Sequence, residues 1–282
     1  MNSFHYLEPR SIDEAARLLR EHGAGARILA GGTDLIVQME TGRRQPETVV
    51  YLGRIPELRG IETADGGLRI GAGATLRQVE NHPVVRERYP SLSRGCAEVG
   101  SVQIRNLATL AGNLCNASPS ADTSPALLAY DAAVEITGGS AGSRVVPVGD
   151  FWTGPGRTVL EPGELVTAIR LPTAPAGRRD FYTKLAVRKA MDLAMVGVCV
   201  ALVPDGDRAH DVRIALGAVA PVCLRAVDAE AAVERGGAAA SDEAAALAEA
   251  AVSPIDDQRA SAAYRREMVR VLTARALRQL LA

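Results

Sequence analysis

The sequence predicts an α+β fold in which two small α/β units precede a C-terminal domain made of a three-stranded antiparallel sheet and helices. Short apolar runs alternate with helical patterns up to residue 171. Residues 172–178 then hold two prolines and a glycine, a composition typical of a linker. Beyond the linker, two long β-type runs flank the turn sequence PDGD. A chain of 282 residues is long enough for two or three domains, which we place at 1–57, 58–174 and 178–282.

The N-terminal unit is predicted from alternating strand and helix patterns. Ser11 and Glu14 have the spacing of a capping box, and apolar residues then recur at helical spacing until Gly23 supplies a stop. An apolar run leads into Gly31 and Gly32, and the LIVQME after them indicates at least one helical turn. The strands of this unit are expected at 4–7, 27–30 and 48–52.

The second unit is predicted to mix helices with strands as well. Its helical segments lie between residues 77 and 100 and are broken at Pro83 and Pro90, because proline disrupts a helix interior. The glycine-rich sequences GGSAG (138–142) and WTGPG (152–156) indicate turns. We expect the two units to face each other, since clefts between domains are common ligand sites. The strands are expected at 68–70, 132–136, 145–148 and 165–171.

The C-terminal domain is predicted from three β-type runs followed by two helices. The Ala-rich tract 241–252 favours a helix, with Ser241 as its cap. A last helix near 260–280 is expected to pack one apolar stripe on the sheet and to leave its arginines in solvent. The strands are expected at 181–187, 194–203 and 212–219, the last two joined by PDGD. The stripe consists of Tyr264, Met268, Leu272, Ala276 and Leu280.

Composition excludes several classes of function. Lys plus Arg number 32 and Asp plus Glu 33, so the net charge of −1 gives no support for a nucleic-acid partner. The longest apolar run, 193–203, is too short to span a bilayer, and the N-terminus lacks the pattern of a secretory signal. We therefore expect a cytoplasmic protein without membrane insertion. Its cysteines form no CxxC pair, so no metal or iron–sulfur site is expected in this chain. They are Cys96, Cys115, Cys199 and Cys223.

Two segments of small residues have the composition of anion-binding loops. The first, Ala26 to Asp34 (ARILAGGTD), is a strand that runs into two glycines before a helix start, a geometry that holds a pyrophosphate on backbone amides. The alternative is an ordinary turn in which Asp34 caps the following helix. The pattern GxGxxG is absent, so a Rossmann nucleotide site is not indicated.

The second segment, Thr109 to Asn113, has too few bulky side chains for a core and too little charge for a solvated loop. Glycine leaves its amide uncovered, and consecutive amides in such turns form a concave phosphate site. Downstream, Ser124 is expected as the N-cap of a helix with Pro125 at its first position. Asp122 is then not needed as a cap, and it either accepts hydrogen bonds from a nucleotide or is an ordinary turn aspartate.

Four segments carry a resemblance to a known family. They are AGGTDL at 30–35, SVQIRNLATLAGNLCNASPSAD at 101–122, EPGEL at 161–165 and LGAVAP at 216–221. In this order they resemble the FAD-binding medium subunit of the molybdenum hydroxylases, a family that includes xanthine dehydrogenase, aerobic carbon monoxide dehydrogenase and hydroxybenzoyl-CoA reductase. The resemblance implies a two-part FAD-binding unit of the PCMH type, followed by a domain like that of the carbon monoxide dehydrogenase flavoproteins.

The resemblance also implies where FAD is bound. It assigns the pyrophosphate to residues 28–35 and 109–113 and a nucleotide contact to Asp122. It further places an aliphatic side chain near the flavin and a basic residue on the first strand of the C-terminal domain, for which the alternative is an exposed strand lysine. The implied FAD-binding residues are Ile28, Leu29, Ala30, Gly31, Gly32, Thr33, Asp34, Leu35, Val99, Ser101, Thr109, Leu110, Ala111, Gly112, Asn113, Asp122, Leu165, Val166 and Lys184.

The sequence departs from the family pattern at four places, one of which is the first loop, where GGTDL replaces the GGHSL type of carbon monoxide dehydrogenases and argues against that substrate. Ala111 replaces a glycine that the family often has, and its methyl group fits if φ there is negative. Val99 stands where xanthine dehydrogenases can carry an aromatic residue beside the flavin. Asp192 to Ala194 lie where some relatives place a tyrosine near the ring. Whether an aromatic side chain stacks on the flavin therefore stays open.

The implied function is that of an electron-transfer flavoprotein subunit of an oxidoreductase. The resemblance implies a large molybdopterin subunit and a small subunit with two 2Fe-2S clusters as partners, and an external electron acceptor. Molybdopterin and 2Fe-2S are expected in those partners only. No catalytic residue is expected, because the redox chemistry belongs to the cofactor. The alternatives are a nucleotide-binding scaffold subunit without flavin turnover and a stand-alone FAD oxidoreductase.

Overall fold

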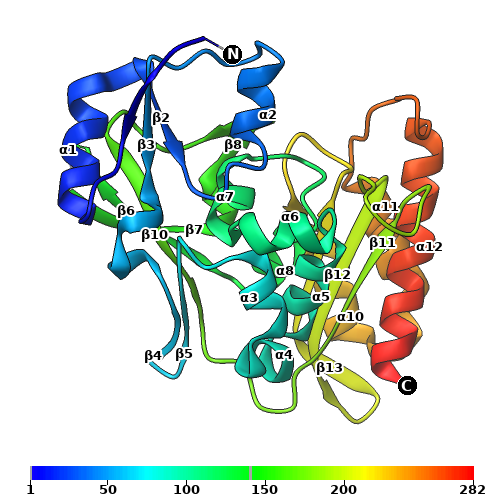
Figure 1. The fold of residues 1–282 in the computed structure, drawn as a ribbon. Coiled ribbons are helices and arrows are strands. Elements are labelled where there is room, and N and C mark those ends of the chain that lie inside the picture. Colours follow the sequence, from blue (N-terminus) through cyan, green and yellow to red (C-terminus); the bar gives the residue numbers. More distant parts are fainter. Residues whose placement is uncertain (1, 140–141) are drawn as a thin grey trace.

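The computed structural model describes residues 2–139 and 142–282 and arranges them around three main sheets. In Figure 1 the N-terminal sheet and α1 lie on one side, the helices of the second unit lie in the centre, and the C-terminal sheet with α12 lies on the other side. The predicted α+β architecture is confirmed. No helix in the described part of the chain combines the length and the apolar character needed to cross a membrane.

The N-terminal unit is a parallel sheet of order β1-β3-β2, formed by β1 (His5–Leu7), β2 (Ala26–Leu29) and β3 (Thr48–Tyr51). Helix α1 (Ile12–His22) begins at Ser11, whose hydroxyl accepts the Glu14 N–H, and ends at Gly23. The Glu14 carboxylate accepts the N–H of Arg10 instead of Ser11, so only half of the predicted capping box forms. Helix α2 (Leu35–Glu40) follows the glycine pair; Asp34 precedes it without a capping bond from its side chain.

The second unit contains a five-stranded antiparallel sheet of order β4-β5-β10-β6-β7. Pro83 and Pro90 separate three helices as predicted, since each proline stands at a helix start. Residues 140 and 141 of the predicted GGSAG turn lie outside the described residues, and WTGPG forms a small hairpin. The strands are β4 (Ile61–Ala64), β5 (Gly67–Gly71), β6 (Ala133–Gly138), β7 (Gly142–Pro147), β8 (Trp152–Gly154), β9 (Arg157–Thr158) and β10 (Glu164–Leu171).

The helices of the second unit outnumber those predicted from the sequence. The motif at 101–122, called the central segment below, contains α6 and α7, each six residues long; α7 lies where a turn was predicted at 109–113. These helices are too short to show a clear apolar periodicity, so only their capping side chains reveal them. The helices are α3 (Leu76–Asn81), α4 (Pro83–Arg88), α5 (Pro90–Glu98), α6 (Val102–Leu107), α7 (Leu110–Cys115), α8 (Ser124–Ala129) and α9 (Val148–Phe151).

The C-terminal sheet has the predicted hairpin and one strand more than predicted. Strands β11 (Arg179–Leu185), β12 (Val196–Asp205) and β13 (Arg208–Gly217) are antiparallel neighbours, and the two-residue strand β14 (Leu224–Arg225) adds to β13. Helix α10 (Val227–Gly236) was not predicted. The remaining helices are α11 (Ser241–Ala250) and α12 (Ala262–Leu281).

Two details of the predicted C-terminal helices are wrong. Ser241 lies inside the first turn of α11, where its hydroxyl donates to the Ala238 carbonyl, and it caps nothing. On α12 the predicted stripe packs on the core at Met268, Leu272, Ala276 and Leu280, but Tyr264 is exposed and the neighbouring Arg265 is buried. Arg265 donates to the Met195 and Ala218 carbonyls and pairs with Asp257. These acceptors lie far away in sequence, so periodicity could not identify them.

The LGAVAP motif joins the C-terminal sheet to the central segment. A Cβ on Gly217 would lie 2.9 Å from Pro125 Cγ, so only glycine allows this close packing. The next residue, Ala218, donates its N–H to the Pro119 carbonyl at 2.7 Å. The motif therefore brings the C-terminal domain against the segment that was predicted to bind a cofactor.

Candidate cofactor site

A cavity of about 710 Å³ opens where the two N-terminal units and a loop of the C-terminal domain meet. It brings together residues from both predicted anion-binding segments, which are about 75 positions apart in the sequence. The predicted site residues that line it are Ile28, Ala30, Gly31, Gly32, Thr33, Asp34, Leu35, Val99, Thr109, Ala111, Gly112, Asn113, Asp122 and Val166.

The first segment packs directly against the end of α6. A Cβ on Gly31 would lie 2.0 Å from the Leu107 carbonyl oxygen, so glycine is required for the two segments to touch. Gly32 has a φ of +74°, which also favours glycine. Within residues 2–139 and 142–282, the N–H groups of Gly32, Thr33 and Asp34 donate to no protein acceptor. This loop thus presents uncovered amides to the cavity, as the sequence predicted.

The second segment differs from the prediction because it begins a helix. Thr109 caps α7: its hydroxyl accepts the Gly112 N–H at 2.9 Å, and its carbonyl accepts the Asn113 N–H. The Leu110 N–H donates to the Ala74 carbonyl. Most amides of this segment are therefore used inside the protein, and the predicted row of bare amides is wrong here. Ala111 is helical and buried, so its methyl group fits without strain.

Helix α8 begins at Ser124, one residue earlier than predicted, so Pro125 occupies its second position instead of its first. Thr123 occupies the N-cap position without a capping bond, and Ser124 and Pro125 are the first two residues of α8. The Thr123 hydroxyl instead donates to Asn113 Oδ1 at 2.7 Å. With Oδ1 bound to Thr123, the Asn113 Nδ2 group is the donor that faces a ligand. Asp122 is not the cap, as predicted.

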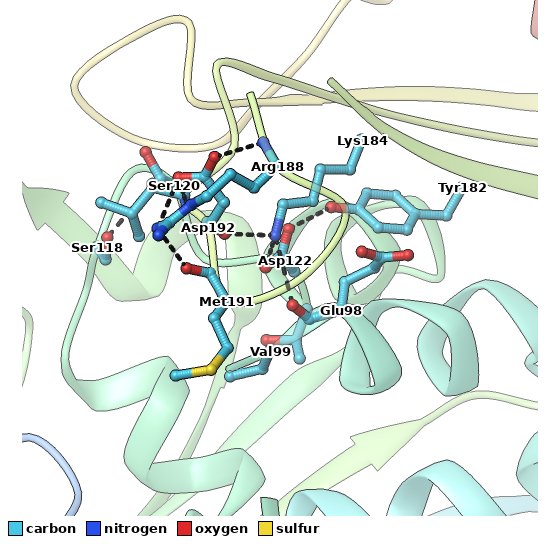
Figure 2. A network of polar contacts seen from close by, with 12 residues as sticks. Glu98, Val99, Ser118, Ser120, Asp122, Tyr182, Lys184, Arg188, Met191 and Asp192 are labelled. Atoms are coloured by element: carbon cyan, nitrogen blue, oxygen red, sulfur yellow. Dashed lines mark hydrogen bonds and ion pairs between the residues drawn. The ribbon is translucent and has the colours of Figure 1, made fainter. Parts of the chain in front are cut away.

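Asp122 lies in a buried polar network with two residues of strand β11 (Figure 2). Its Oδ1 accepts the Tyr182 hydroxyl and its Oδ2 accepts Lys184 Nζ, both at 2.9 Å. Burial raises the pKa of Asp122 to about 6, although Lys184 and the Tyr182 hydroxyl both act to lower it. Asp122 lines the cavity, so its carboxyl group, with the raised pKa, can meet a ligand there.

Lys184 itself does not line the cavity. Only 6% of its side chain is exposed, and Nζ forms an ion pair with Asp122, so the alternative of an exposed strand lysine is wrong. Its remaining partners are the backbone carbonyls of Asp192 and Glu98, at 2.7 and 3.4 Å. A sequence pattern could not reveal this, because Lys184 and Asp122 are joined only by the docking of the C-terminal sheet.

The other predicted residues outside the cavity wall have structural contacts. Leu110 and Leu165 are fully buried in the main core, and Leu29 packs beneath Gly32. The hydroxyl of Ser101 accepts the N–H of Ile104 and thereby caps α6. Of the two aliphatic candidates near the flavin, Val166 lines the cavity and Leu165 points to the core, since neighbouring strand residues face opposite sides.

Several cavity residues were not predicted. Arg27, Gln38 and Arg44 lie on the wall near the first segment, and the Arg44 Nε donates to Gln38 Oε1 at 3.0 Å. The burial of Arg27 and the nearby Arg44 charge lower the pKa of the Arg27 guanidinium. Two arginines flanking a glycine loop are a signal that could have been recognised in the sequence, because anion sites often carry such residues. The polar side chains of Asn116, Ser118 and Ser120 also line the cavity.

The EPGE sequence and a loop of the C-terminal domain, which we call the mouth loop, also line the cavity. Residues 161–164 line the wall, and Glu164 is held by an ion pair with Arg144. The mouth loop, residues 186–193, contributes Asp192 and Leu193. No aromatic side chain lines the cavity in the described part of the chain. Aliphatic groups such as Val99 and Val166 therefore form its apolar surface.

The cysteines and histidines form no second reactive centre among the described residues. Cys96, Cys199 and Cys223 are buried, and burial raises the pKa of each thiol. In residues 2–139 and 142–282, no group of three or more His, Cys, Asp or Glu side chains is placed to hold a metal ion. Among the described residues, these thiols and carboxylates therefore offer no metal centre, and any redox chemistry at the cavity would come from a bound ligand.

Two protein-family models match almost the whole chain. Residues 2–174 match the FAD binding domain in molybdopterin dehydrogenase, and residues 181–280 match the CO dehydrogenase flavoprotein C-terminal domain. The carbon monoxide dehydrogenase medium chain of Afipia carboxidovorans is 37% identical over 98% of this chain and 96% of its own length. A putative xanthine dehydrogenase FAD-binding subunit of Escherichia coli is 36% identical over 80% of this chain and 77% of its own length.

Solved structures show the same similarity. A chain of the Cu,Mo-CO dehydrogenase in its cyanide-inactivated form superposes with a TM-score of 0.95 and 36% identity, covering 99% of this chain and 98% of that chain. A chain of quinoline 2-oxidoreductase from Pseudomonas putida gives a TM-score of 0.92 with 30% identity, covering 99% of this chain and 97% of that chain.

Proposed function

The chain belongs to the FAD-binding medium subunits of the molybdenum hydroxylases, an oxidoreductase family, and on this premise we propose that it is an electron-transfer subunit. In this proposal, electrons pass from 2Fe-2S clusters of a small partner subunit through FAD to an external acceptor. A large molybdopterin subunit carries out the chemistry on the organic substrate. The complex is proposed to be cytoplasmic.

The observation that carries the proposal is the contact between the two small-residue segments at one cavity. Gly31 lies against Leu107, and the adjoining amides of Gly32, Thr33 and Asp34 have no protein acceptor in the described ranges. Uncovered amides in a concave loop suit a phosphate oxygen. The cavity volume of about 710 Å³ is in the range of ligand and cofactor sites. The residues present thus fit FAD.

We assign roles to the lining residues from their chemistry. The first segment and the Asn113 Nδ2 group would hold the diphosphate, with Arg27 and Arg44 supplying positive charge beside it. Asp122 would accept hydrogen bonds from the nucleotide. Val99 and Val166 would pack against the flavin and exclude water from it. The redox chemistry belongs to the bound flavin, and these residues bind and orient it.

The proposed domain boundaries of 1–57, 58–174 and 178–282 agree with this division of roles. The first two parts supply both small-residue segments, and the third supplies Lys184 and the mouth loop. The cavity is complete only when all three are present. An assay of flavin binding therefore requires the full chain.

The direct test is flavin content. The purified chain should be yellow and release FAD on denaturation, and the apoprotein should take FAD up again. A chain that stays colourless with added FAD would contradict the proposal and favour a scaffold subunit. Coexpression with the neighbouring reading frames should recover two further subunits. A yellow chain that acts alone on a substrate and recovers no partner would favour a stand-alone oxidoreductase instead.

A further inference from the structure

We propose that Arg178 is a positioning residue for the cofactor site. It is held between the rings of Tyr89 and Tyr130, a contact that we call the clamp. The clamp anchors strand β11 to the second unit, and β11 in turn holds Asp122 at the cavity wall. The inference deepens the proposed function and rests on it, whereas the clamp itself can be tested without the cofactor.

Arg178 is buried at the end of the linker, between two aromatic rings. Only 6% of its side chain is exposed, and its guanidinium carbon lies 4.2 Å from the centre of the Tyr130 ring and 5.3 Å from that of Tyr89. Both distances are within the range of a cation–π contact, which is strongest where water is excluded. The guanidinium also donates to the Arg88 carbonyl, and its Nε lies 3.7 Å from Asp180 Oδ2. All of these groups except Asp180 belong to the second unit, so Arg178 joins the two domains.

The linker is held at both of its ends by the same residues. The Tyr89 hydroxyl donates to the Pro172 carbonyl at 2.6 Å, where the linker begins, and Arg178 is the last residue of the linker. Residues 173–177 between these points are mostly exposed. A segment with the composition of a flexible linker is therefore fixed where it enters β11, which restrains swinging of the C-terminal domain about it.

Strand β11 presents alternate side chains to two different cores. Phe181 and Leu185 pack against the core of the C-terminal domain, whereas Tyr182 between them is buried in the main core. Side chains alternate along a strand, so the even-numbered residues from Arg178 to Lys184 share the face toward the second unit. One whole face of β11 is thus available to position groups of the second unit.

The even-numbered side chains form a row of polar contacts that ends at the cavity. Arg178 occupies the clamp, and Asp180 accepts two hydrogen bonds from the start of α5. Tyr182 and Lys184 then donate to the two carboxylate oxygens of Asp122, each at 2.9 Å (Figure 2). The row spans about 20 Å, given the rise per residue of a strand. The clamp is therefore at one end of β11, and the groups that hold a cavity residue are at the other.

A second contact between the same domains provides a control outside β11. Asp131, the residue after Tyr130, belongs to the second unit. It pairs with Arg213 on β13 and Arg225 on β14, at 2.9 and 2.8 Å. Its φ is +51°, a conformation that asparagine also tolerates, so Asp131→Asn removes the ion pairs without backbone strain. Gly42→Ala is the second control, because it strains a turn of the N-terminal unit and leaves the clamp intact.

The first test is lysine labelling of the FAD-free protein, because the only lysines of the chain are Lys184 on β11 and the exposed Lys189. The Lys184 side chain is buried and reacts only when β11 opens. Arg178→Met should raise the labelling rate of Lys184 relative to Lys189 by roughly tenfold or more, the factor that follows from losing a desolvated cation–π contact. Asp131→Asn and Gly42→Ala should leave this ratio near that of wild type. An equal rise in either control would overturn the proposal, since Lys184 would then report only on domain docking or global stability.

Replacing a tyrosine of the clamp gives an independent pair of variants, in case Arg178→Met does not fold. Tyr130→Phe keeps the ring that covers the guanidinium, whereas Tyr130→Leu removes it. The labelling ratio should therefore rise in Tyr130→Leu and stay near wild type in Tyr130→Phe. An equal rise in both would assign the effect to the hydroxyl, which accepts the Ser91 N–H, and would contradict a cation–π clamp.

The second test measures the pKa of Asp122, a property of the folded state that does not respond to global stability. Burial raises this pKa to about 6, and the contacts to Lys184 and Tyr182 act against the rise. When β11 lifts in Arg178→Met, all of these influences weaken together, so the pKa should return toward 3.8. The carbon-13 NMR shift of the side-chain carboxyl, assigned by its loss in Asp122→Asn, reports the pKa. An unchanged value in Arg178→Met would reduce the clamp to a structural contact and overturn the positioning role.

FAD affinity tests the functional part of the proposal. Arg178→Met should raise the Kd for FAD by roughly two- to thirtyfold, the range for residues that act on a site without touching its ligand. Asp131→Asn and Gly42→Ala should bind like wild type. Normal affinity in Arg178→Met, with faster labelling of Lys184, would overturn the positioning role and leave the proposed function standing. Wild-type protein that binds no FAD, with labelling as expected, would contradict the proposed function and keep the role of the clamp in placing Asp122.

Discussion

Replacing Gly32 with alanine tests whether the first loop holds the cofactor, and the chain contains a matched control. Gly32 and Gly42 have nearly equal left-handed φ values of +74° and +73°. Alanine at either position should therefore suffer the same backbone strain, roughly 1–2 kcal/mol. Gly32 lines the cavity, whereas Gly42 lies in the turn after α2.

The two substitutions differ in what the new methyl group meets. At Gly42 the nearest atom would be Gln45 Nε2 at 3.8 Å, an ordinary contact. At Gly32 the methyl group would lie 3.1 Å from Leu29 Cδ1 and 3.2 Å from Ile36 Cγ1. Leu29 Cδ1 is the end of a flexible side chain, whereas Ile36 Cγ1 is bonded to a branched Cβ, so part of the adjustment falls on the loop itself. We expect the two variants to lose similar unfolding free energy, about 1–2 kcal/mol each.

FAD affinity should separate the variants. A shift that weakens one amide–phosphate hydrogen bond costs about 1.5–3 kcal/mol, or roughly ten- to a hundredfold in Kd. Gly32→Ala should show this loss, and Gly42→Ala should bind like wild type. Quenching of flavin fluorescence during titration of the apoprotein gives the affinity, and urea denaturation gives the stability. Wild-type affinity in Gly32→Ala, or an equal loss in Gly42→Ala, would refute the placement of the diphosphate.

Three further predictions concern groups that the structure places in unusual surroundings. The pKa of Asp122 is raised from 3.8 to about 6, so between these pH values the folded protein holds a proton that the unfolded chain has lost. The contribution of this proton to the unfolding free energy is complete below pH 3.8 and is lost as the pH rises through 6. Asp122→Asn should remove this decline from unfolding free energies of the apoprotein measured between these pH values, and an unchanged pH profile would contradict the assignment. An amine-reactive reagent should modify the exposed Lys189 rapidly and the buried Lys184 side chain only on unfolding, as measured by peptide mass spectrometry. Equal labelling rates of the two lysines in the folded protein would exclude the network in Figure 2. Arg265→Met should lower the unfolding free energy by roughly 1–3 kcal/mol, because it leaves the buried Met195 and Ala218 carbonyls without the Arg265 donor. Arg266→Met on the exposed face should change it by less than about 0.5 kcal/mol.

The predictions that succeeded depended on neighbours in the sequence. The α+β pattern, the helix breaks at Pro83 and Pro90 and the hairpin at PDGD each follow from a few consecutive residues. The glycine pair at 31 and 32 likewise predicted an uncovered loop, because the conformation of such a turn is intrinsic to glycine. The central motif was recognised as part of the site on its composition and its family resemblance.

The errors occurred where the outcome depended on partners far along the chain. The amides of residues 109–113 were predicted to be bare, yet Ala74 accepts the Leu110 N–H and Thr109 accepts those of Gly112 and Asn113. Arg265 was predicted to lie in solvent, yet it donates to the Met195 carbonyl just before β12 and to the Ala218 carbonyl just after β13. In both cases hydrogen bonding decided the conformation, and a buried polar group must find a partner wherever the fold supplies one.

By itself, the sequence determined the fold class and two segments that line the cofactor cavity, because turn chemistry and periodicity act over short stretches of chain; the family followed from the resemblance of four motifs. Only the tertiary structure decided how the cavity is closed. Gly31 meets Leu107, and Lys184 meets Asp122, through contacts that no local pattern encodes. The physical reason is that the position and charge state of a buried group depend on its desolvation and on the acceptors around it, which exist only after the sheets have packed.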